Sequence, residues 1–297
     1  MGRYLVMLVM FFLVINVKSQ GLLKRYYIEI NKAELYITEN KLMEAKLIYD
    51  TLFKVYDFVY AKDLLISISL DSKTDNYNSL TVKKITKLFR RGVKISRIKR
   101  MFLWDSLNIN QQNELKTAFR SNYNKDVNIK LQTSIDKLFK QDQRIRNYIN
   151  FNFFKKRVQK TDSILHLKYI DLIKKNGRYI GEKDIGVFDR YMYACQSAIL
   201  ALHCDNESNK TIDLIIDSAF INMDIHNITY AEIKDRRYLH KYRKQKYGTA
   251  LSLLDKTDND YIKELNSNRK KIYLDTIKEH LNKILNNKSD INLIYIN

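Results

Sequence analysis

Small and aromatic residues recur at helical spacing near the start of the chain, and polar stretches interrupt them. In "INKAELYITENKLMEAKLIYDTLF", Ala33 and Tyr36 fall on one helical face, and Ala45 and Tyr49 fall on one face of the next helix. The polar letters "ENK" separate the two. Small residues at such positions let two helices approach closely, and the aromatic side chains fill the groove between them. The pattern predicts a helical hairpin.

The spacing of these four residues resembles the tetratricopeptide repeat. A weaker copy lies in "DNYNSLTVKKITKLFRRG", where Leu80 occupies the position of Ala45 at an offset close to the repeat period of about 34 residues. The resemblance implies about two degenerate repeats within residues 20–130, with a concave face that binds a protein or peptide partner. An ordinary bundle of helical hairpins is the alternative.

Composition also favours helices. The 297 residues include no proline and only 7 glycines, so turns fall to Asn, Asp, Ser and Lys, and the short connections of a sheet are disfavoured. Further helices are expected between Ile95 and Lys130, with a polar break at "SNYNKDVN" and with Trp104 as a packing residue. We predict an all-α protein, with tetratricopeptide-like helical hairpins over residues 20–130 and a helical bundle domain over residues 131–297.

The first residues form a separate segment. Arg3 supplies a positive charge, and Tyr4 to Val17 form an apolar run of signal-peptide length, after which "VKS" offers small residues for cleavage before Gln20. We predict a signal peptide over residues 1–19 and a secreted or periplasmic protein with no stable membrane span after cleavage. The alternative is an uncleaved N-terminal anchor, although the run is somewhat short of the roughly 20 apolar residues that a span needs.

Export to an oxidising compartment would permit disulfides. Cys195 and Cys204 both lie in "VFDRYMYACQSAILALHCD", for which we predict one helix. Nine residues at about 100° each would place the two thiols on opposite faces and roughly 13 Å apart along the axis, too far to bridge. Both cysteines are expected to be small buried hydrophobic residues.

The formal net charge of +20 is spread along the chain. The densest group of basic residues lies between Lys234 and Lys246, is diluted by Glu232 and Asp235, and has no nucleic-acid-binding motif beside it. We therefore predict no nucleic-acid partner and favour a weak attraction to anionic surfaces as the consequence of the charge.

A series of polar motifs marks the second half. They are "DQRIR", "HCD", the pair Asp235–Arg236, "QKYGTA" and a late arginine, Arg269. In order and spacing they resemble a bacterial family with a domain of unknown function, whose signature runs DQxxR, a Gly-containing turn, HxD, DR, QxYGTQ and a late Arg. The resemblance covers roughly residues 138–285, and Ala250 stands where the family usually has glutamine. The family has no assigned activity, so the resemblance implies a grouping of residues and no reaction.

Several of these residues would share helical faces. Asp142 and Arg146 are four residues apart and would pair, while Gln196, Leu200 and His203 would present an amide and an imidazole to neighbouring helices. His203 would act as a general base with a carboxylate orienting its second nitrogen, and an arginine would hold an anionic group. The candidates for catalysis are therefore His203, Asp142 and Asp235, and those for ligand binding are Gln143, Arg146, Asp205, Arg236, Gln245, Tyr247, Thr249 and Arg269.

Each motif also has a structural explanation. Asp–Arg pairs and a buried histidine tie helices together, and Gly248 would be a left-handed helix C-cap with Lys244 and Lys246 complementing the helix dipole. His203 and Asp205 are only two ligands, so neither a metal nor another cofactor is predicted. We expect a protein-interaction or scaffold module with a polar pocket in its second half and a protein or peptide partner on its N-terminal helices. A hydrolase or a binder of small anionic ligands is the alternative.

Overall fold

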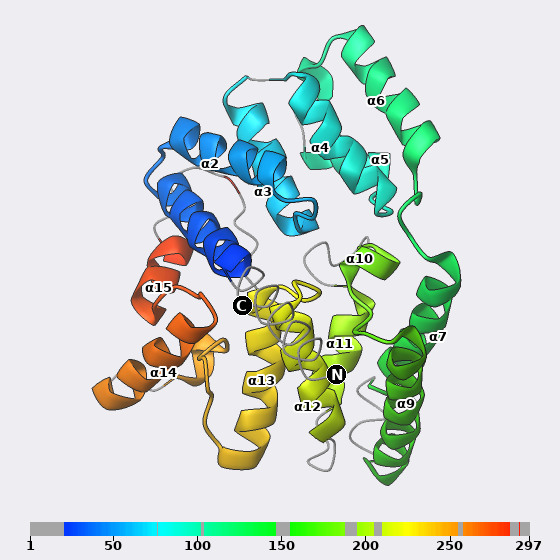
Figure 1. Cartoon of the computed structure of the whole chain (residues 1–297), viewed down its shortest axis with the longest axis vertical. Coiled ribbons are helices and arrows are strands. Elements are labelled where there is room, and N and C mark those ends of the chain that lie inside the picture. The colour runs from blue at the N-terminus through cyan, green and yellow to red at the C-terminus, as the bar shows by residue number, and fades with distance from the viewer. Residues whose placement is uncertain are drawn as a thin grey trace, which may run out of the picture.

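The computed structural model describes residues 21–75, 77–101, 104–146, 155–187, 195–204, 210–254, 258–285 and 291. These residues form helices joined by short turns, and none of them lies in a strand, so the all-α prediction is confirmed (Figure 1). The predicted signal peptide lies outside this part of the chain. Among the described residues, no helix combines the length and the apolar character that crossing a membrane requires.

The first half is an array of helices that pack in sequence order (Figure 1). Ala33, Ala45 and Tyr49, which the hairpin pattern places between helices, are all buried. The tetratricopeptide arrangement itself stays a prediction. The array consists of a helix over residues 21–38, α2 (Leu42–Val55), α3 (Ala61–Lys73), α4 (Ser79–Arg90), α5 (Ile95–Met101), the 3₁₀ turn η1 (Trp104–Ser106) and α6 (Ile109–Asn122).

Asparagines begin and end helices in this half. The Asn78 side chain accepts hydrogen bonds from two backbone N–H groups of the first turn of α4, and Asn108 caps α6 through the N–H at its third position. Asn40 and Asn124 have left-handed backbones in the turns that follow residues 21–38 and α6, with φ of 60° and 61°. Asparagine tolerates this region better than most residues, so these turns form without glycine or proline.

The second half continues without a break in the core. The boundary predicted between residues 130 and 131 falls in the first turn of α7, and one cluster of buried apolar residues runs from Leu23 to Ile291 across it. Helix α11 packs on both α7 and α13. The elements are α7 (Ile129–Ile145), α9 (Lys155–Asn176), α10 (Glu182–Ile185), α11 (Gln196–His203), α12 (Lys210–Ile221), α13 (Asn227–Tyr242), the 3₁₀ turn η2 (Leu251–Leu253), α14 (Asn259–Lys271) and α15 (Ile277–Leu285).

The first and last described helices lie side by side (Figure 1). The Lys283 ammonium of α15 lies 3.0 Å from Glu34 Oε2 in the helix over residues 21–38. Lys62 of α3 approaches the other oxygen of Glu34 to 3.1 Å, and Asn31 Nδ2 donates to Tyr273 O at 2.8 Å. Glu34, Lys62 and Lys283 are all buried, so charge pairing fastens the end of the chain to its beginning.

A second group of buried charges joins α2, α3 and α4. Lys84 of α4 has no exposed surface, and its ammonium lies 2.9 Å from Asp71 Oδ2 of α3 and also contacts Asp50 of α2. Lys46 pairs with both carboxylates, lying 3.2 Å from Asp71 Oδ1. Thr81 Oγ1 donates to Asp71 Oδ2 at 2.9 Å. We call Lys46, Asp50, Asp71 and Lys84 the first-half charge cluster.

The prediction of one helix around the two cysteines is wrong. Helix α11 begins only at Gln196, Cys195 before it has an extended backbone, and Val187 is not helical. The segment is apolar on nearly every side, and hydrophobic periodicity cannot fix the ends of such a helix. Cys195 and Cys204 flank α11, and both are buried and outside any disulfide, which confirms that they pack as small hydrophobic residues.

Candidate functional site

His203 and Asp142 meet, although 61 residues separate them in sequence. His203 Nδ1, at the end of α11, lies 2.7 Å from Asp142 Oδ2 of α7. Arg146 Nε lies 3.0 Å from Asp142 Oδ1, so the pairing predicted from their spacing is confirmed. Arg146 Nη2 lies 2.8 Å from Asp162 Oδ1 of α9. The group therefore connects three helices.

The contacts determine how the His203 ring is used. Burial opposes ionisation of Asp142, but hydrogen bonds and charges from His203 and Arg146 outweigh it and lower the pKa of this carboxyl. Arg146 Nε is also 3.0 Å from His203 Nδ1, yet a guanidinium only donates and a carboxylate only accepts. All three groups are satisfied when Nδ1 carries its proton toward Asp142. Nε2 has no partner among the described residues.

A second contact holds α11 on α7. Gln196 Nε2 donates to Asp136 Oδ1 at 2.7 Å, seven residues before His203 on the same face of α11. The predicted face, with an amide and an imidazole directed at a neighbouring helix, is confirmed. Gln143 Nε2 adds a bond of 2.9 Å to Asp142 Oδ2.

Asp235 binds the backbone of the "QKYGTA" loop. Its carboxylate accepts from the N–H groups of Lys246, Tyr247 and Thr249 at 2.7, 2.6 and 2.7 Å, and from Thr249 Oγ1 at 2.8 Å. Asp235 is 3% exposed, so these bonds replace those that water would make. A carboxylate has about four acceptor positions, and the loop supplies a donor for each. In this arrangement Asp235 is a structural anchor.

The loop is also closed by its own side chains. Gln245 Nε2 donates to Ala250 O at 2.9 Å, and Gln245 Oε1 accepts from Ala250 N at 2.8 Å. Ala250 takes part through its backbone, so these bonds do not depend on its side chain. Arg269 Nη1 donates to Tyr247 O at 2.8 Å. Gly248 has a φ of 67°, a conformation that favours glycine.

The predicted helix C-cap at Gly248 is wrong. Helix α13 ends at Tyr242, and its left-handed C-cap is Arg243, with a φ of 58°. Gly248 turns the chain later, inside the loop that Asp235 holds. Three backbone N–H groups of the loop point at the Asp235 carboxylate. The left-handed backbone at Gly248 lets the loop turn so that all three reach it.

The predicted site residues fall into two groups. Arg237 of α13 donates to the backbone carbonyl of Cys204, beside His203, whereas Asp235 lies two positions earlier and about 200° away around the helix. The two groups therefore occupy different sides of α13. Asp205 lies outside the described residues, and the half-buried Arg236 is next to Asp235. One group is Asp142, Gln143, Arg146 and His203; the other is Asp235, Gln245, Tyr247, Thr249 and Arg269.

Glu232 is a carboxyl on α13, one turn before Asp235. The side chain is partly buried, and among the described residues it makes no hydrogen bond or ion pair. Burial first, and then the charge of Asp235, raise its pKa to about 8, against a smaller opposing effect of Lys62.

We expect Glu232→Gln to stabilise the protein in alkaline solution and to leave it unchanged in acid. Well below the unfolded pKa of about 4.5 the carboxyl is protonated in both states; as the pH rises toward the folded value, only the unfolded chain ionises, which favours unfolding. The gain should reach about 2 kcal/mol above about pH 8, allowing for partial exposure. Urea unfolding at acidic and alkaline pH measures it. Glu264→Gln, at an exposed position of α14, is the control, and an equal gain in acid and alkali would contradict the assignment.

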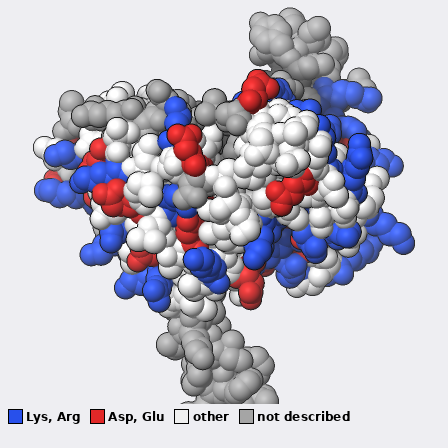
Figure 2. All heavy atoms as spheres, turned by 90° about the horizontal axis from the view of Figure 1, so that it is seen from above, with Lys and Arg blue, Asp and Glu red and all other residues white. Residues whose placement is uncertain are grey.

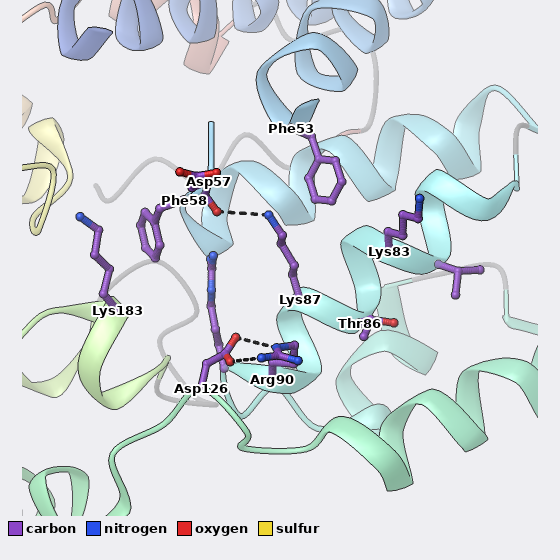
Figure 3. Close-up of a pocket in the computed structure, with 11 residues that line it drawn as sticks. Phe53, Asp57, Phe58, Lys83, Thr86, Lys87, Arg90, Asp126 and Lys183 are labelled. Carbon is purple, nitrogen blue, oxygen red and sulfur yellow. Dashed lines mark hydrogen bonds and ion pairs between the residues drawn. The ribbon is translucent and has the colours of Figure 1, made fainter. Parts of the chain in front are cut away.

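A hollow of about 660 Å³ lies in the first half, beside α4 (Figure 3). Its walls come from the turn between α2 and α3, from α4, from the turn before α7 and from α10. Two phenylalanine rings provide apolar surface with cations over them. Lys87 Nζ lies 4.6 Å from the centre of the Phe53 ring, while Arg91 Cζ and Lys183 Nζ lie 4.3 and 5.1 Å from that of Phe58. Such contacts are attractive.

Three of the cations in the hollow already have acidic partners. Arg90 Nε lies 2.8 Å from Asp126 Oδ2, and the two side chains make a second contact through Arg90 Nη2 (Figure 3). Arg91 Nη1 lies 2.9 Å from Glu182 Oε1. Lys183 Nζ, at the far edge, lies 3.1 Å from Asp224 Oδ1. These pairs hold the walls of the hollow in position.

The other two cations are not compensated. Lys83 and Lys87 are four residues apart on α4, and neither has a carboxylate within ion-pairing distance among the described residues. Lys87 Nζ donates to the backbone carbonyl of Asp57 at 3.2 Å (Figure 3). Burial first, and then the charge of Arg91, lower the pKa of Lys87. Like charges at this spacing destabilise a helix slightly, so a bound anion would relieve the repulsion.

Elsewhere the positive charge is dispersed. Figure 2 shows Lys and Arg side chains on both flanks of one face, with Asp and Glu among them. In the part of the chain that the structure describes, no group of three or more His, Cys, Asp or Glu side chains is placed to hold a metal ion.

Sequence reasoning missed the hollow. Its phenylalanines and cations come from separate segments, and only "SLTVKKITKLFR", a helix with five basic and no acidic residues counting the following Arg91, carried a local signal. The sequence matches no family model, and comparison with curated proteins and with solved structures finds no significant similarity.

Proposed function

We propose that this protein is a binding module that holds an acidic segment of a protein partner in the hollow beside α4. The observation that carries the proposal is Lys87, a partly buried cation packed on Phe53 without a carboxylate partner among the described residues. A carboxylate of the partner would complete this pair and would also meet Lys83. Charge-assisted hydrogen bonds of this kind are roughly twice as strong as neutral ones.

The size and lining of the hollow favour a peptide segment over a free small anion. Its volume of about 660 Å³ is in the range that holds a drug-sized molecule, which corresponds to several side chains. The rings of Phe53 and Phe58 provide apolar contact that a bare anion would not use. A segment that alternates acidic and apolar residues matches both components.

The scaffold supports this use. Ordered pairs such as Arg90–Asp126 and Arg91–Glu182 fix the walls, and the first-half charge cluster fixes α4 against α2 and α3. A preformed site loses little conformational entropy on binding. This binding function agrees with the protein or peptide partner that the sequence predicts on the N-terminal helices. The tetratricopeptide resemblance and secretion stay part of the proposal.

We expect Lys87→Gln to weaken binding of a labelled peptide of alternating Glu and Leu residues by about tenfold, or ~1.4 kcal/mol, because one charge-assisted contact is lost. Fluorescence anisotropy at low salt measures the dissociation constant. The Gln/Leu counterpart of the peptide tests the need for charge. Lys168→Gln removes an equal charge from an exposed position of α9 and should change affinity less than twofold.

The variant also separates binding from folding. Lys87→Gln relieves the repulsion with Arg91, which offsets the lost contacts with Phe53 and Asp57, so the variant should have a free energy of unfolding close to that of the parent. Equal losses of affinity in Lys87→Gln and Lys168→Gln would show that only net charge matters and would overturn the assignment to this hollow.

Hydrolysis centred on His203 remains the second prediction. The 2.7 Å contact with Asp142 and the open Nε2 are what a general base requires, and Arg146 is already engaged by two aspartates. The hollow beside α4 has a defined lining and an uncompensated cation, so the binding function has the stronger support.

A further inference from the structure

A small cavity lies where the first and last described helices meet α13. Its volume is about 20 Å³, enough for roughly one water-sized particle. The helix over residues 21–38, α3, the N-terminus of α13 and the segment between α14 and α15 surround it. Four charged side chains contribute to its walls: Glu34, Lys62, Arg269 and Asp275.

The two carboxylates in the wall are already neutralised. Glu34 has Lys62 at 3.1 Å and Lys283 at 3.0 Å, and Asp275 Oδ2 has Lys283 at 2.6 Å. Two negative and two positive charges therefore balance. His280 adds no charge, because burial first and then Arg269 lower its pKa to about 3, which leaves the imidazole neutral at physiological pH.

Arg269 is the cation of the wall that has no direct ion pair, and the carboxylates of Asp275, Asp235 and Glu279 compensate its charge only from a distance. It is 1% exposed, and its bonded partners are backbone carbonyls: Nη1 donates to Tyr247 O at 2.8 Å, and Nε donates to Asp275 O. No carboxylate of the described residues lies within ion-pairing distance, and Nη2 is buried without a hydrogen-bond partner. Burial lowers the pKa of Arg269 only to about 10, so it stays charged. A buried cation without a paired anion destabilises the folded protein.

His226 supplies a second donor in the same wall, and this donor makes no hydrogen bond within the protein. Its Nδ1 accepts from the N–H of Ile228 at 3.3 Å, so in the neutral ring the proton is on Nε2. Nε2 is buried without a hydrogen-bond partner, since Asp63 Oδ2 lies 3.8 Å away. His226 is also the N-cap of α13, a helix of 16 residues. The positive end of that helix therefore faces the cavity.

We propose that this cavity binds one small monovalent anion, with chloride as the physiological candidate, which accepts hydrogen bonds from Arg269 Nη2 and His226 Nε2. The anion neutralises the remaining charge of Arg269 at the positive end of α13. It also joins α13 and α14 at the place where the first and last described helices meet.

Bromide is the direct probe, because it replaces chloride and scatters X-rays anomalously. Crystals of the 297-residue chain grown in sodium bromide should show an anomalous peak within hydrogen-bonding distance of Arg269 Nη2 and His226 Nε2. A water molecule there, with no anomalous signal, would overturn the proposal.

Thermal unfolding gives an independent readout. At constant ionic strength, a tenfold rise in chloride against gluconate should raise the unfolding midpoint by about 3 °C once chloride exceeds its dissociation constant. His226→Asn keeps a capping acceptor for α13 but removes the donor, and this variant should lose the chloride dependence. His240→Asn, at an exposed position of the same helix, should retain it. A midpoint of the parent protein that is insensitive to chloride would also reject the proposal.

Discussion

Asp235→Ala is expected to lower the free energy of unfolding by about 3 to 5 kcal/mol, because a buried anchor that receives four hydrogen bonds is removed. The N–H groups of Lys246, Tyr247 and Thr249 would lose their common acceptor in an interior that water reaches poorly. Asp235→Asn retains one carbonyl oxygen and should lose roughly half as much.

Urea unfolding measures the loss, and hydrogen exchange locates it. The amides of Lys246, Tyr247 and Thr249 should exchange much faster in Asp235→Ala, because their protection depends on this carboxylate. Asp260→Ala is the matched control, since Asp260 is an exposed acid on α14 paired with Lys263, and it should cost under about 0.5 kcal/mol. A loss below about 1 kcal/mol with unchanged exchange would show that the loop holds its shape by itself.

Asp71→Ala is expected to have an effect of similar size, about 3 to 4 kcal/mol, in the first half of the chain. Lys84 would keep only its contact with Asp50, although its side chain has no exposed surface, and Lys46 would lose one of two partners. The Thr81 hydroxyl would lose its acceptor as well. The loss of stability arises mainly because Lys84 is left buried with less negative charge around it. It should therefore be smaller when residue 84 carries no charge.

A double-mutant cycle tests that dependence. Lys84→Met in the Asp71→Ala background removes the stranded cation, and it should recover about 1 to 2 kcal/mol of the loss. Lys140→Met, which breaks an exposed pair with Asp136 on α7, should cost little in either background. Strict additivity of Asp71→Ala and Lys84→Met would mean that the two residues do not stabilise each other.

The parts of this fold that depend on neighbours in sequence were predictable. The helical class follows from the absence of proline and the scarcity of glycine, and the pairing of Asp142 with Arg146 follows from their four-residue spacing on α7. Asparagine turns were expected on the same grounds, and Asn40 and Asn124 form them. In each case the energetic preference operates within one or two turns of the chain.

The remainder depends on tertiary packing. His203 lies against Asp142 because α11 packs on α7. No local sequence pattern encodes how two distant helices pack together. The motifs around Asp235 and "QKYGTA" were noticed, but their separation from His203 follows from which side of α13 each faces. One wall of the hollow beside α4 forms where Lys183 packs on Phe58, and Lys183 is almost a hundred residues from Lys87 in sequence.

The salt bridge between Glu34 and Lys283 gives the molecule a property that an open solenoid lacks. In an open stack each terminal unit touches one neighbour only, and it can unravel without disturbing the rest. Here the first and last described helices support each other directly. Glu34 also pairs with Lys62, and Lys283 also pairs with Asp275, so loosening either helix weakens a buried charge network that both share. This network couples the two helices into one cooperative unit.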